Sequence, residues 1–292
     1  MTTPVPAAAG EGPLAIICGG GALPFAVADA VMRRGRRVVL FPVRGWVDPR
    51  TVAGYPHHFI EIGRYGSFRR QAAAEGCRDV VMIGTVLRPA LRQIRFDWEA
   101  LRELPSIVRM FRGGDNHLLS SLARLLEKRG FRFLGAHEVA PEILMPAGAI
   151  GRREPDARDR ADIERGVALL SAVGPFDVGQ AVVVAQNHVL AIEAAEGTDR
   201  MLARIAELRG AGRVRSPIGT GALVKMPKPA QDSRFDLPAI GPPTVTGAAR
   251  AGLAGIAVMA GATIVAEPAE VAAAADAAGI FVTGIAPDER GP

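Results

Sequence analysis

Residues 14–35, LAIICGGGALPFAVADAVMRRG, decide the first half of the fold. An apolar run ends in the glycines Gly19 to Gly21, and apolar side chains then recur at helical spacing. This order predicts a strand, a tight turn and a helix whose first backbone N–H groups favour an anion. A second apolar run at residues 38–45 follows at the distance that a β-α-β unit requires. We therefore expect a parallel sheet that begins at residue 14.

The alternation of apolar and amphipathic stretches continues to residue 139. It predicts further strands at residues 58–63, 79–86 and 130–139, a helix at residues 66–77, and within residues 109–130 a longer helix that Gly113, Gly114, Asp115 and Asn116 precede. The last strand is expected to carry His137 and Glu138 at its end, and Asp115 or Asn116 is expected to cap the longer helix. This pattern predicts a Rossmann-like domain at residues 14–139.

The ends of these strands supply the first candidate site. In an open parallel sheet, ligands bind beyond the carboxyl ends of the strands. Gly20, Gly21, Ala22 and Thr85 follow two such ends and are candidate substrate contacts. The glycine turn does not match the GxGxxG fingerprint of dinucleotide-binding proteins, and tight turns of this kind also form without a ligand.

A change of composition separates the second half of the chain. Three prolines and a rise in charge mark residues 140–155 as a linker, and a helix at residues 157–174 is expected to open a domain at residues 156–292. Strands are predicted at residues 180–186, 188–196 and 221–227, the first two as a hairpin, with a helix at residues 200–210 and a helix-strand-helix-strand order over residues 246–285. The sequence therefore predicts an α/β protein, with an N-terminal Rossmann-like parallel-sheet domain and a C-terminal α/β domain.

A charged loop at residues 225–241, KMPKPAQDSRFDLPAIG, is the second candidate site. Its prolines exclude a helix or an inner strand and restrict the loop before any ligand arrives. Lys225, Lys228 and Arg234 are suited to hold a phosphate, which leaves one of the two carboxylates, Asp232 or Asp236, for a metal ion or a water molecule. A solvated turn whose charges pair with one another is the alternative interpretation.

Polar residues around the predicted hairpin extend this second site. Gln180 precedes its first strand, and Thr198 and Asp199 follow its second strand. We interpret all three as candidate substrate contacts. Thr198 or Asp199 would equally serve as a simple N-cap of the helix at residues 200–210.

Composition narrows the class of protein and of ligand. The 292 residues are 49% hydrophobic and 22% charged, which is typical of a globular protein with two cores. The net charge of +5, with only 5% aromatic residues and no long basic run, fits a phosphate ligand or an anionic membrane surface better than a nucleic acid. Two cysteines exclude a disulfide framework and favour the cytoplasm. Residues 1–13 lack the apolar core of a signal peptide and are predicted to form a disordered tail.

Six segments together carry a family resemblance. They are LAIICGGGALP, GAHEV, DVGQAVVV, AIEAAEGTD, KPxQDxRxDLPxIG and AARAGLAGIAVMAG, in this order between residues 14 and 287. The chain resembles the UDP-2,3-diacylglucosamine pyrophosphatase family of lipid A biosynthesis, of the two-domain type that is unrelated to the calcineurin-like phosphoesterases. The resemblance implies Mg²⁺-dependent hydrolysis of the pyrophosphate in UDP-2,3-diacylglucosamine, which gives UMP and 2,3-diacylglucosamine 1-phosphate.

The same resemblance implies roles for single residues and a place in the cell. Asp236, in the RxDLP element, is the implied catalytic residue, either as the base that activates water or as a metal ligand, and Asp232 is the weaker candidate. The enzyme is expected in the cytoplasm, in peripheral contact with the inner membrane. The oligomeric state stays open, with a homodimer as one option.

Two other function classes stay open at this point. An oxidoreductase or glycosyltransferase of the Rossmann type would need an acidic residue at the end of the second strand to hold a ribose, but the chain has Pro42, Val43 and Arg44 there. A non-catalytic nucleotide or lipid sensor would bind the same substrate and leave it intact.

Overall fold

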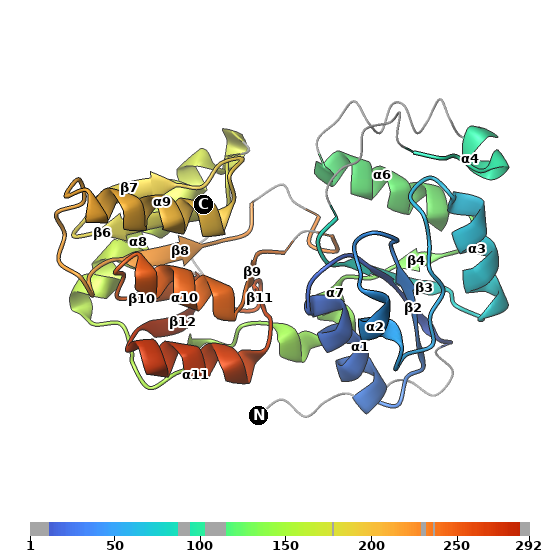
Figure 1. Ribbon diagram of the computed structural model, residues 1–292, viewed down its shortest axis with the longest axis horizontal. Helices are drawn as coiled ribbons and strands as arrows, with labels where there is room; N and C mark the ends of the chain where they lie inside the picture. The colour runs from blue at the N-terminus through green and yellow to red at the C-terminus, as the bar shows by residue number, and fades with distance from the viewer. Residues whose placement is uncertain are drawn as a thin grey trace. The chain divides into compact units, whose positions relative to one another are not determined.

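The computed structural model describes residues 12–86, 94–102, 115–176, 178–228, 232–235 and 237–286. It divides into two compact units, of which the first runs to Glu142 and also takes in Asp232–Asp236, and the second comprises Ile143–Gln231 and Leu237–Pro292. Each unit has its own sheet and its own helices (Figure 1). The α/β class predicted for both halves is confirmed. The predicted tail, residues 1–13, lies outside the described residues except for Gly12 and Pro13.

A parallel sheet forms the centre of the first unit, as the opening stretch predicts. Its strands lie in the order β2-β1-β3-β4, and every neighbouring pair is parallel. They are β1 (Leu14–Cys18), β2 (Val38–Pro42), β3 (Asp79–Ile83) and β4 (Arg132–Phe133). Burial on both faces explains why the first two strands read as unbroken apolar runs.

Helices pack on this sheet and complete the core. On the sheet itself lie α1 (Leu23–Arg33), α3 (Tyr65–Ala74), α6 (Asp115–Glu127) and α7 (Ala136–Val139), whereas α4 (Trp98–Arg102) packs on α3, and α2 (Pro49–Val52) comes between β2 and α3 in the chain. Phe68 of α3 and Leu126 of α6 join Phe41 and Phe133 of the sheet in one cluster. Phe235, which comes from the charged loop, packs against the same cluster.

Two predicted strands of the first unit are wrong in detail. In place of the strand at residues 58–63, the chain forms only two isolated bridges, His57 with Leu40 and Ile60 with Val43, because the hydrogen bond that would link them needs an N–H at Pro42, which has none. Residues 130–139 give the two-residue β4 and then α7, so His137 and Glu138 lie on a helix. The Glu138 carboxylate accepts a hydrogen bond from the amide of Gly135 at the start of this helix, which favours a helical turn there.

The second unit is built on a mixed sheet of six strands in the order β5-β12-β10-β8-β6-β7. The strands are β5 (Gly148–Ala149), β6 (Ala181–Ala185), β7 (His188–Ile192), β8 (Ala222–Lys225), β10 (Gly255–Met259) and β12 (Phe281–Ile285). Strands β8, β10 and β12 are parallel, and β6 and β7 form the predicted hairpin, whose turn residues Gln186 and Asn187 have positive φ. Strand β5 lies within residues 140–155, which were predicted to be a linker, so part of that segment belongs to the sheet of the second unit.

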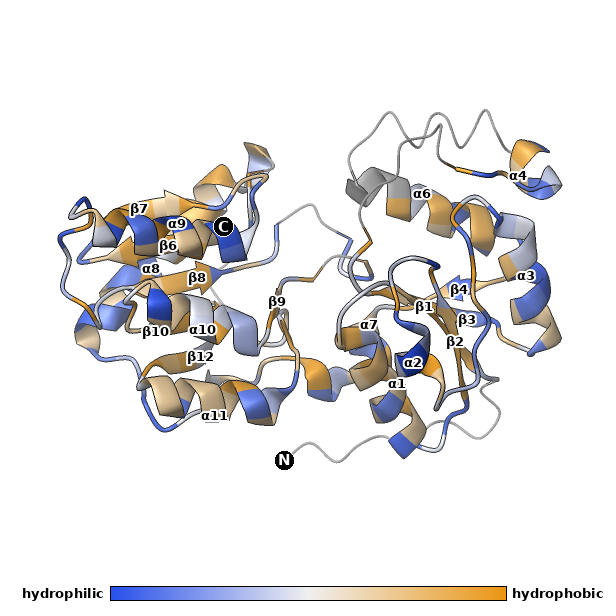
Figure 2. Cartoon of the chain, viewed as in Figure 1, coloured by the Kyte–Doolittle hydropathy of each residue, from blue (hydrophilic) through white to orange (hydrophobic). Residues whose placement is uncertain are grey.

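Helices cover both faces of this sheet. They are α8 (Ala157–Val173), α9 (Thr198–Gly210), α10 (Pro242–Arg250) and α11 (Pro268–Ala278). The short helix η3 (Gly174–Phe176) follows α8, and the short helix η2 (Pro141–Ile143) contains the residues at which the first unit ends along the chain and the second begins. One core joins α9, α10 and α11 to the sheet, and a second core joins α8 to it. The strands are mostly apolar whereas the helices carry mixed colours (Figure 2). Strands β9 (Ala239–Ile240) and β11 (Ile264–Val265), which the sequence did not predict, pair in parallel beside them.

Within the described ranges, no helix is both long and apolar enough to cross a lipid bilayer.

Candidate active site

A pocket of about 260 Å³ lies in the second unit, where β8 ends and α9 begins. The residues that line it are Glu196, Gly197, Thr198, Asp199, Lys225, Ala239 and Thr244. Lys225 is the last residue of β8, and Gly197 turns the chain into α9 with a φ of 79°. A strand end, a helix start and the polar side chains Thr198, Asp199 and Lys225 thus meet at one place, as the sequence predicts for these three residues.

Thr198 forms the centre of a hydrogen-bond chain at this pocket. Its side-chain oxygen lies 2.9 Å from Lys225 Nζ and 2.8 Å from Glu193 Oε1. An ammonium group only donates and a carboxylate only accepts, so the hydroxyl must donate to Glu193 and accept from Lys225. The simple capping role is wrong for Thr198, because Gly197 is the N-cap residue and no side chain caps α9.

Glu193 belongs to the same hydrogen-bond chain and was not predicted from the sequence as a site residue. Its second carboxylate oxygen accepts a hydrogen bond of 2.9 Å from the backbone amide of Gln180, which brings the predicted Gln180 into the same assembly. Its backbone bonds to Ala181 and Gly179. A side chain at position 179 would place Cβ 2.3 Å from the Glu193 carbonyl oxygen, so this approach requires glycine. The sequence shows Glu193 near the hairpin, but it shows equally Glu196, and nothing local distinguishes the two.

The carboxylates at the pocket differ in the hydrogen bonds and ion pairs that they already form. Glu196 accepts hydrogen bonds from its own neighbourhood: from the amide of Ala194 and from Arg204, 2.8 Å away. Backbone hydrogen bonding, with Arg204 adding to it, lowers the pKa of Glu196. Asp199 is exposed at the start of α9, and among the described residues no hydrogen bond or ion pair engages its carboxylate. Of the described residues that line the pocket, Asp199 is therefore the one whose carboxylate is available to a ligand.

The donor set at the pocket fits Mg²⁺ better than a transition metal. Across the described ranges, no three His, Cys, Asp or Glu side chains are grouped so as to enclose a metal ion. Mg²⁺ does not need such a cage, because it binds through one or two carboxylates and takes its other ligands from water and substrate phosphates. Asp199 meets that requirement. Asp236, the candidate from the sequence, lies outside the described residues.

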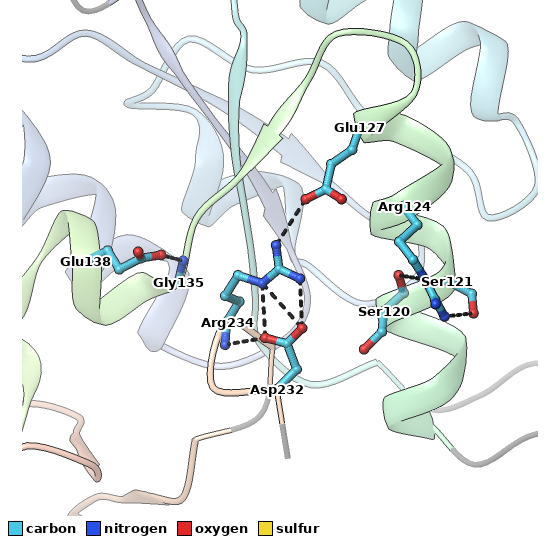
Figure 3. Close-up of polar contacts among 8 residues, drawn as sticks. All are labelled: Ser120, Ser121, Arg124, Glu127, Gly135, Glu138, Asp232 and Arg234. Carbon is cyan, nitrogen blue, oxygen red and sulfur yellow. Dashed lines mark hydrogen bonds and ion pairs between the residues drawn. The ribbon is translucent and has the colours of Figure 1, made fainter. Parts of the chain in front are cut away.

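Arg234, in contrast, lies in a second polar assembly, which belongs to the first unit (Figure 3). Its Nε and Nη2 lie 3.0 and 2.8 Å from the two oxygens of Asp232, and its Nη1 lies 3.0 Å from Glu127 of α6. Its guanidinium also lies 5.1 Å from the ring centre of Phe235, and that ring is 5.8 Å from the ring of Phe133. Hydrogen bonding with Arg234 lowers the pKa of Asp232, and the same bond raises the pKa of Arg234.

The remaining predicted contacts lie in two places. In the first unit, Gly20 and Thr85 exchange two backbone hydrogen bonds of 2.8 and 2.9 Å across the ends of β1 and β3, and Gly21 and Ala22 lead from there into α1. A Cβ on Gly19 would lie 2.5 Å from the backbone of Gly84, so the two strand ends meet only because both residues are glycine. Lys228 lies in the second unit, beyond the end of β8.

Comparison with known proteins identifies the family. The family model "LpxI N-terminal domain" matches residues 13–143, and the family model "LpxI C-terminal domain" matches residues 146–283. The curated protein "UDP-2,3-diacylglucosamine pyrophosphatase LpxI" of Caulobacter vibrioides is 42% identical over 277 residues, which cover 95% of this chain and 99% of that protein. The resemblance predicted from the six segments is thereby confirmed, and the chain belongs to the LpxI family.

Proposed function

We propose that this chain is a hydrolase that cleaves the pyrophosphate bond of UDP-2,3-diacylglucosamine in lipid A biosynthesis. The products are UMP and 2,3-diacylglucosamine 1-phosphate. The observation that carries this proposal is the likeness to the Caulobacter pyrophosphatase, which extends over nearly the whole length of both chains. The pocket of the second unit supports it, because a lysine, a threonine hydroxyl and an uncommitted carboxylate are groups that suit a diphosphate and its metal ion.

The residues at the pocket have separate roles in hydrolysis. Water attacks one phosphorus, the bond to the bridging oxygen breaks, and negative charge grows on the departing phosphate. Lys225 donates to the phosphate oxygens as this charge develops, and Asp199 supplies a carboxylate ligand for Mg²⁺. When bound, Mg²⁺ neutralises phosphate charge and orients the diphosphate. Asp236 orients or deprotonates the water, or completes the metal site. Gly20, Gly21, Ala22, Thr85, Gln180, Lys228 and Arg234 stay candidate substrate contacts.

We also propose that the enzyme is cytoplasmic and makes peripheral contact with the inner membrane, where its acylated substrate resides. The net charge of +5 favours an anionic lipid surface. Trp98 and Leu101 on α4 are 68% and 43% exposed, and tryptophan is a common residue at membrane interfaces. Flotation with anionic and neutral vesicles tests this contact, and light scattering tests the proposed homodimer.

Nucleotide release decides between hydrolysis and the alternatives. We expect the purified protein with Mg²⁺ to release UMP from UDP-2,3-diacylglucosamine, and a chelator to stop it. Asp236→Ala should abolish release while substrate binding and the unfolding midpoint stay unchanged. Binding without cleavage by the wild type would favour the sensor instead. Hydrolysis in ¹⁸O-labelled water shows which phosphorus is attacked, because the label appears in the product that carries that phosphorus.

A further inference from the structure

We infer that Glu193 is a positioning residue, which fixes the Lys225 ammonium group in the pocket through the hydroxyl of Thr198. This inference rests on the proposed function, in which Lys225 serves the diphosphate. Lys225 and Thr198 line the pocket, whereas Glu193 reaches it only through Thr198. Its role would therefore be to orient a neighbour and not to touch the substrate.

The first argument is the direction of the hydrogen bonds. With the Thr198 proton held by Glu193 Oε1 at 2.8 Å, a lone pair of the same oxygen is directed at Lys225 Nζ, 2.9 Å away. Thr198 is only 8% exposed, so its hydroxyl has little access to a substitute partner from solvent. Removing the Glu193 carboxylate would free the hydroxyl to rotate, and Lys225 would lose a fixed acceptor.

The second argument is that Glu193 is itself held firmly. The amide of Gln180 donates to its second carboxylate oxygen, its own amide donates to Ala181, and its carbonyl accepts from Gly179. Such contacts fix the carboxylate before a substrate arrives, which is what a positioning group must provide. Glu196 lies in the same loop but is bound to Arg204 instead, so its charge is committed elsewhere.

A glutamine at position 193 cannot reproduce this arrangement. The carboxylate accepts from two donors, the Thr198 hydroxyl and the Gln180 amide, one on each oxygen. A glutamine side chain has one carbonyl oxygen and one NH₂ group, so one of the two donors would face another donor. If the NH₂ group faces Thr198, the hydroxyl proton must turn away from position 193 and its lone pair is no longer directed at Lys225. If the NH₂ group faces the Gln180 amide, two N–H groups oppose each other where the 2.9 Å hydrogen bond was, and the side chain that orients Thr198 loses its own anchor.

The test is a set of matched variants, each measured for kcat, KM and unfolding midpoint with UDP-2,3-diacylglucosamine and Mg²⁺. We expect Glu193→Gln and Thr198→Val to lower kcat/KM by about tenfold to a hundredfold, mainly in kcat, as the loss of a hydrogen bond to a charged group would. Thr198→Ser keeps the hydroxyl and should stay within about threefold of the wild type. Glu207→Gln, which removes an exposed charge of α9 that lies outside the pocket, should change nothing.

The double variant separates positioning from mere structural support. If Glu193 acts through Thr198, Glu193→Gln should cost less than about threefold in the Thr198→Val background, because the hydroxyl that it orients is already gone. Losses that multiply, or activity that falls only together with the unfolding midpoint, would overturn the inference. So would a Glu193→Gln enzyme that keeps wild-type kcat. If Glu193→Gln fails to fold, a Thr198→Val enzyme as active as Thr198→Ser would overturn it equally.

The same variants distinguish a failure of this inference from a failure of the proposed function. A wild type that releases no UMP refutes the proposed function alone. The variants are then compared for their Kd toward UDP in calorimetry. Weaker binding by Glu193→Gln and Thr198→Val, but not by Thr198→Ser or Glu207→Gln, would support the positioning role. Equal Kd values across the set would overturn it.

Discussion

Lys225 and Arg234 belong to one charged loop, yet they lie in different units and contact different groups. Lys225 donates to the neutral hydroxyl of Thr198 and lines a pocket, so this contact orients the ammonium group without neutralising it. Arg234 lies between Asp232 and Glu127 and is part of the first unit, where both carboxylates form ion pairs with it. In the proposed function, two cations of one loop thus have different tasks, Lys225 toward a ligand and Arg234 toward the fold.

The partners explain this division in physical terms. A guanidinium group presents a rigid fork that fits a carboxylate through two parallel hydrogen bonds, and Arg234 uses it on Asp232 in this way. An ammonium group has no such fork and acts as a point charge on a flexible stem. Lys225 is therefore suited to follow a phosphate during the reaction, provided that a neighbour such as Thr198 holds it in place.

The largest expected effect comes from removing the cation at the pocket. Lys225→Met keeps the length of the side chain and removes the charge that opposes the growing negative charge on the phosphate. We expect kcat/KM to fall by about a hundredfold or more, with little change in the unfolding midpoint. Steady-state kinetics and thermal unfolding measure both quantities. A Lys225→Met enzyme with near-normal activity would erase the distinction between the two cations.

The aromatic contact of the second assembly should give the next largest effect. Phe235 is partly buried against the core of the first unit, and its ring lies 5.8 Å from that of Phe133. Phe235→Ala should lower the free energy of unfolding by about 1–2 kcal/mol, since it removes part of a buried aromatic surface. Phe235→Leu, which keeps most of the apolar contact, is the matched control in urea denaturation. Equal loss in both variants would contradict the packing argument.

Removing the cation of the second assembly should cost stability more than catalysis. Arg234 is about one third exposed, so solvent weakens its ion pairs, and we expect Arg234→Met to cost about 1 kcal/mol. After correction for the fraction of unfolded enzyme, the kcat/KM of Arg234→Met should fall less than tenfold. A loss as large as that of Lys225→Met in a stable protein would instead favour the sequence-based prediction that Arg234 binds substrate.

Much of the fold could be predicted because its periodicity is local. Apolar runs and helical spacing predicted β1, α1, β2, α3, β3 and the β6-β7 hairpin with their order along the chain. What the sequence missed depends on tertiary contacts. The strand at residues 58–63 fails at one missing N–H of Pro42, and the two-residue strands β9 and β11 are too short to leave a periodic pattern.

The candidate site likewise could be predicted where the signal is local and not where it depends on tertiary contacts. Thr198, Asp199 and Lys225 were predicted and lie at one pocket, because strand ends and helix starts gather there in α/β folds. Glu193 was missed because only the fold of the segment between β7 and α9 places it, and not Glu196, against Thr198, and only the hairpin brings it to the amide of Gln180. The ion pair of Arg234 with Glu127 was missed because 107 positions separate the two residues. No local pattern encodes such a partner.

The smallest expected effect is a pH dependence that belongs to the second assembly. Hydrogen bonding with Arg234 places the pKa of Asp232 in the folded protein below its ordinary value of about 3.9. Asp232 therefore contributes stability that is fully present above that ordinary value and is lost as the pH falls through the lower, folded value. We expect the difference in unfolding free energy between wild type and Asp232→Asn to stay below about 1 kcal/mol, constant between pH 5 and 8, and to shrink below about pH 4.

Urea denaturation at several pH values measures this difference, with Phe235→Leu as the uncharged control. The control changes an uncharged side chain of the same segment, so its difference from the wild type should not vary with pH. A difference for Asp232→Asn that persists unchanged at pH 3 would mean that the shape of the side chain, and not its charge, stabilises the assembly. In that case the contrast with Lys225 would be one of packing, because the ion pair around Arg234 would contribute nothing that titrates.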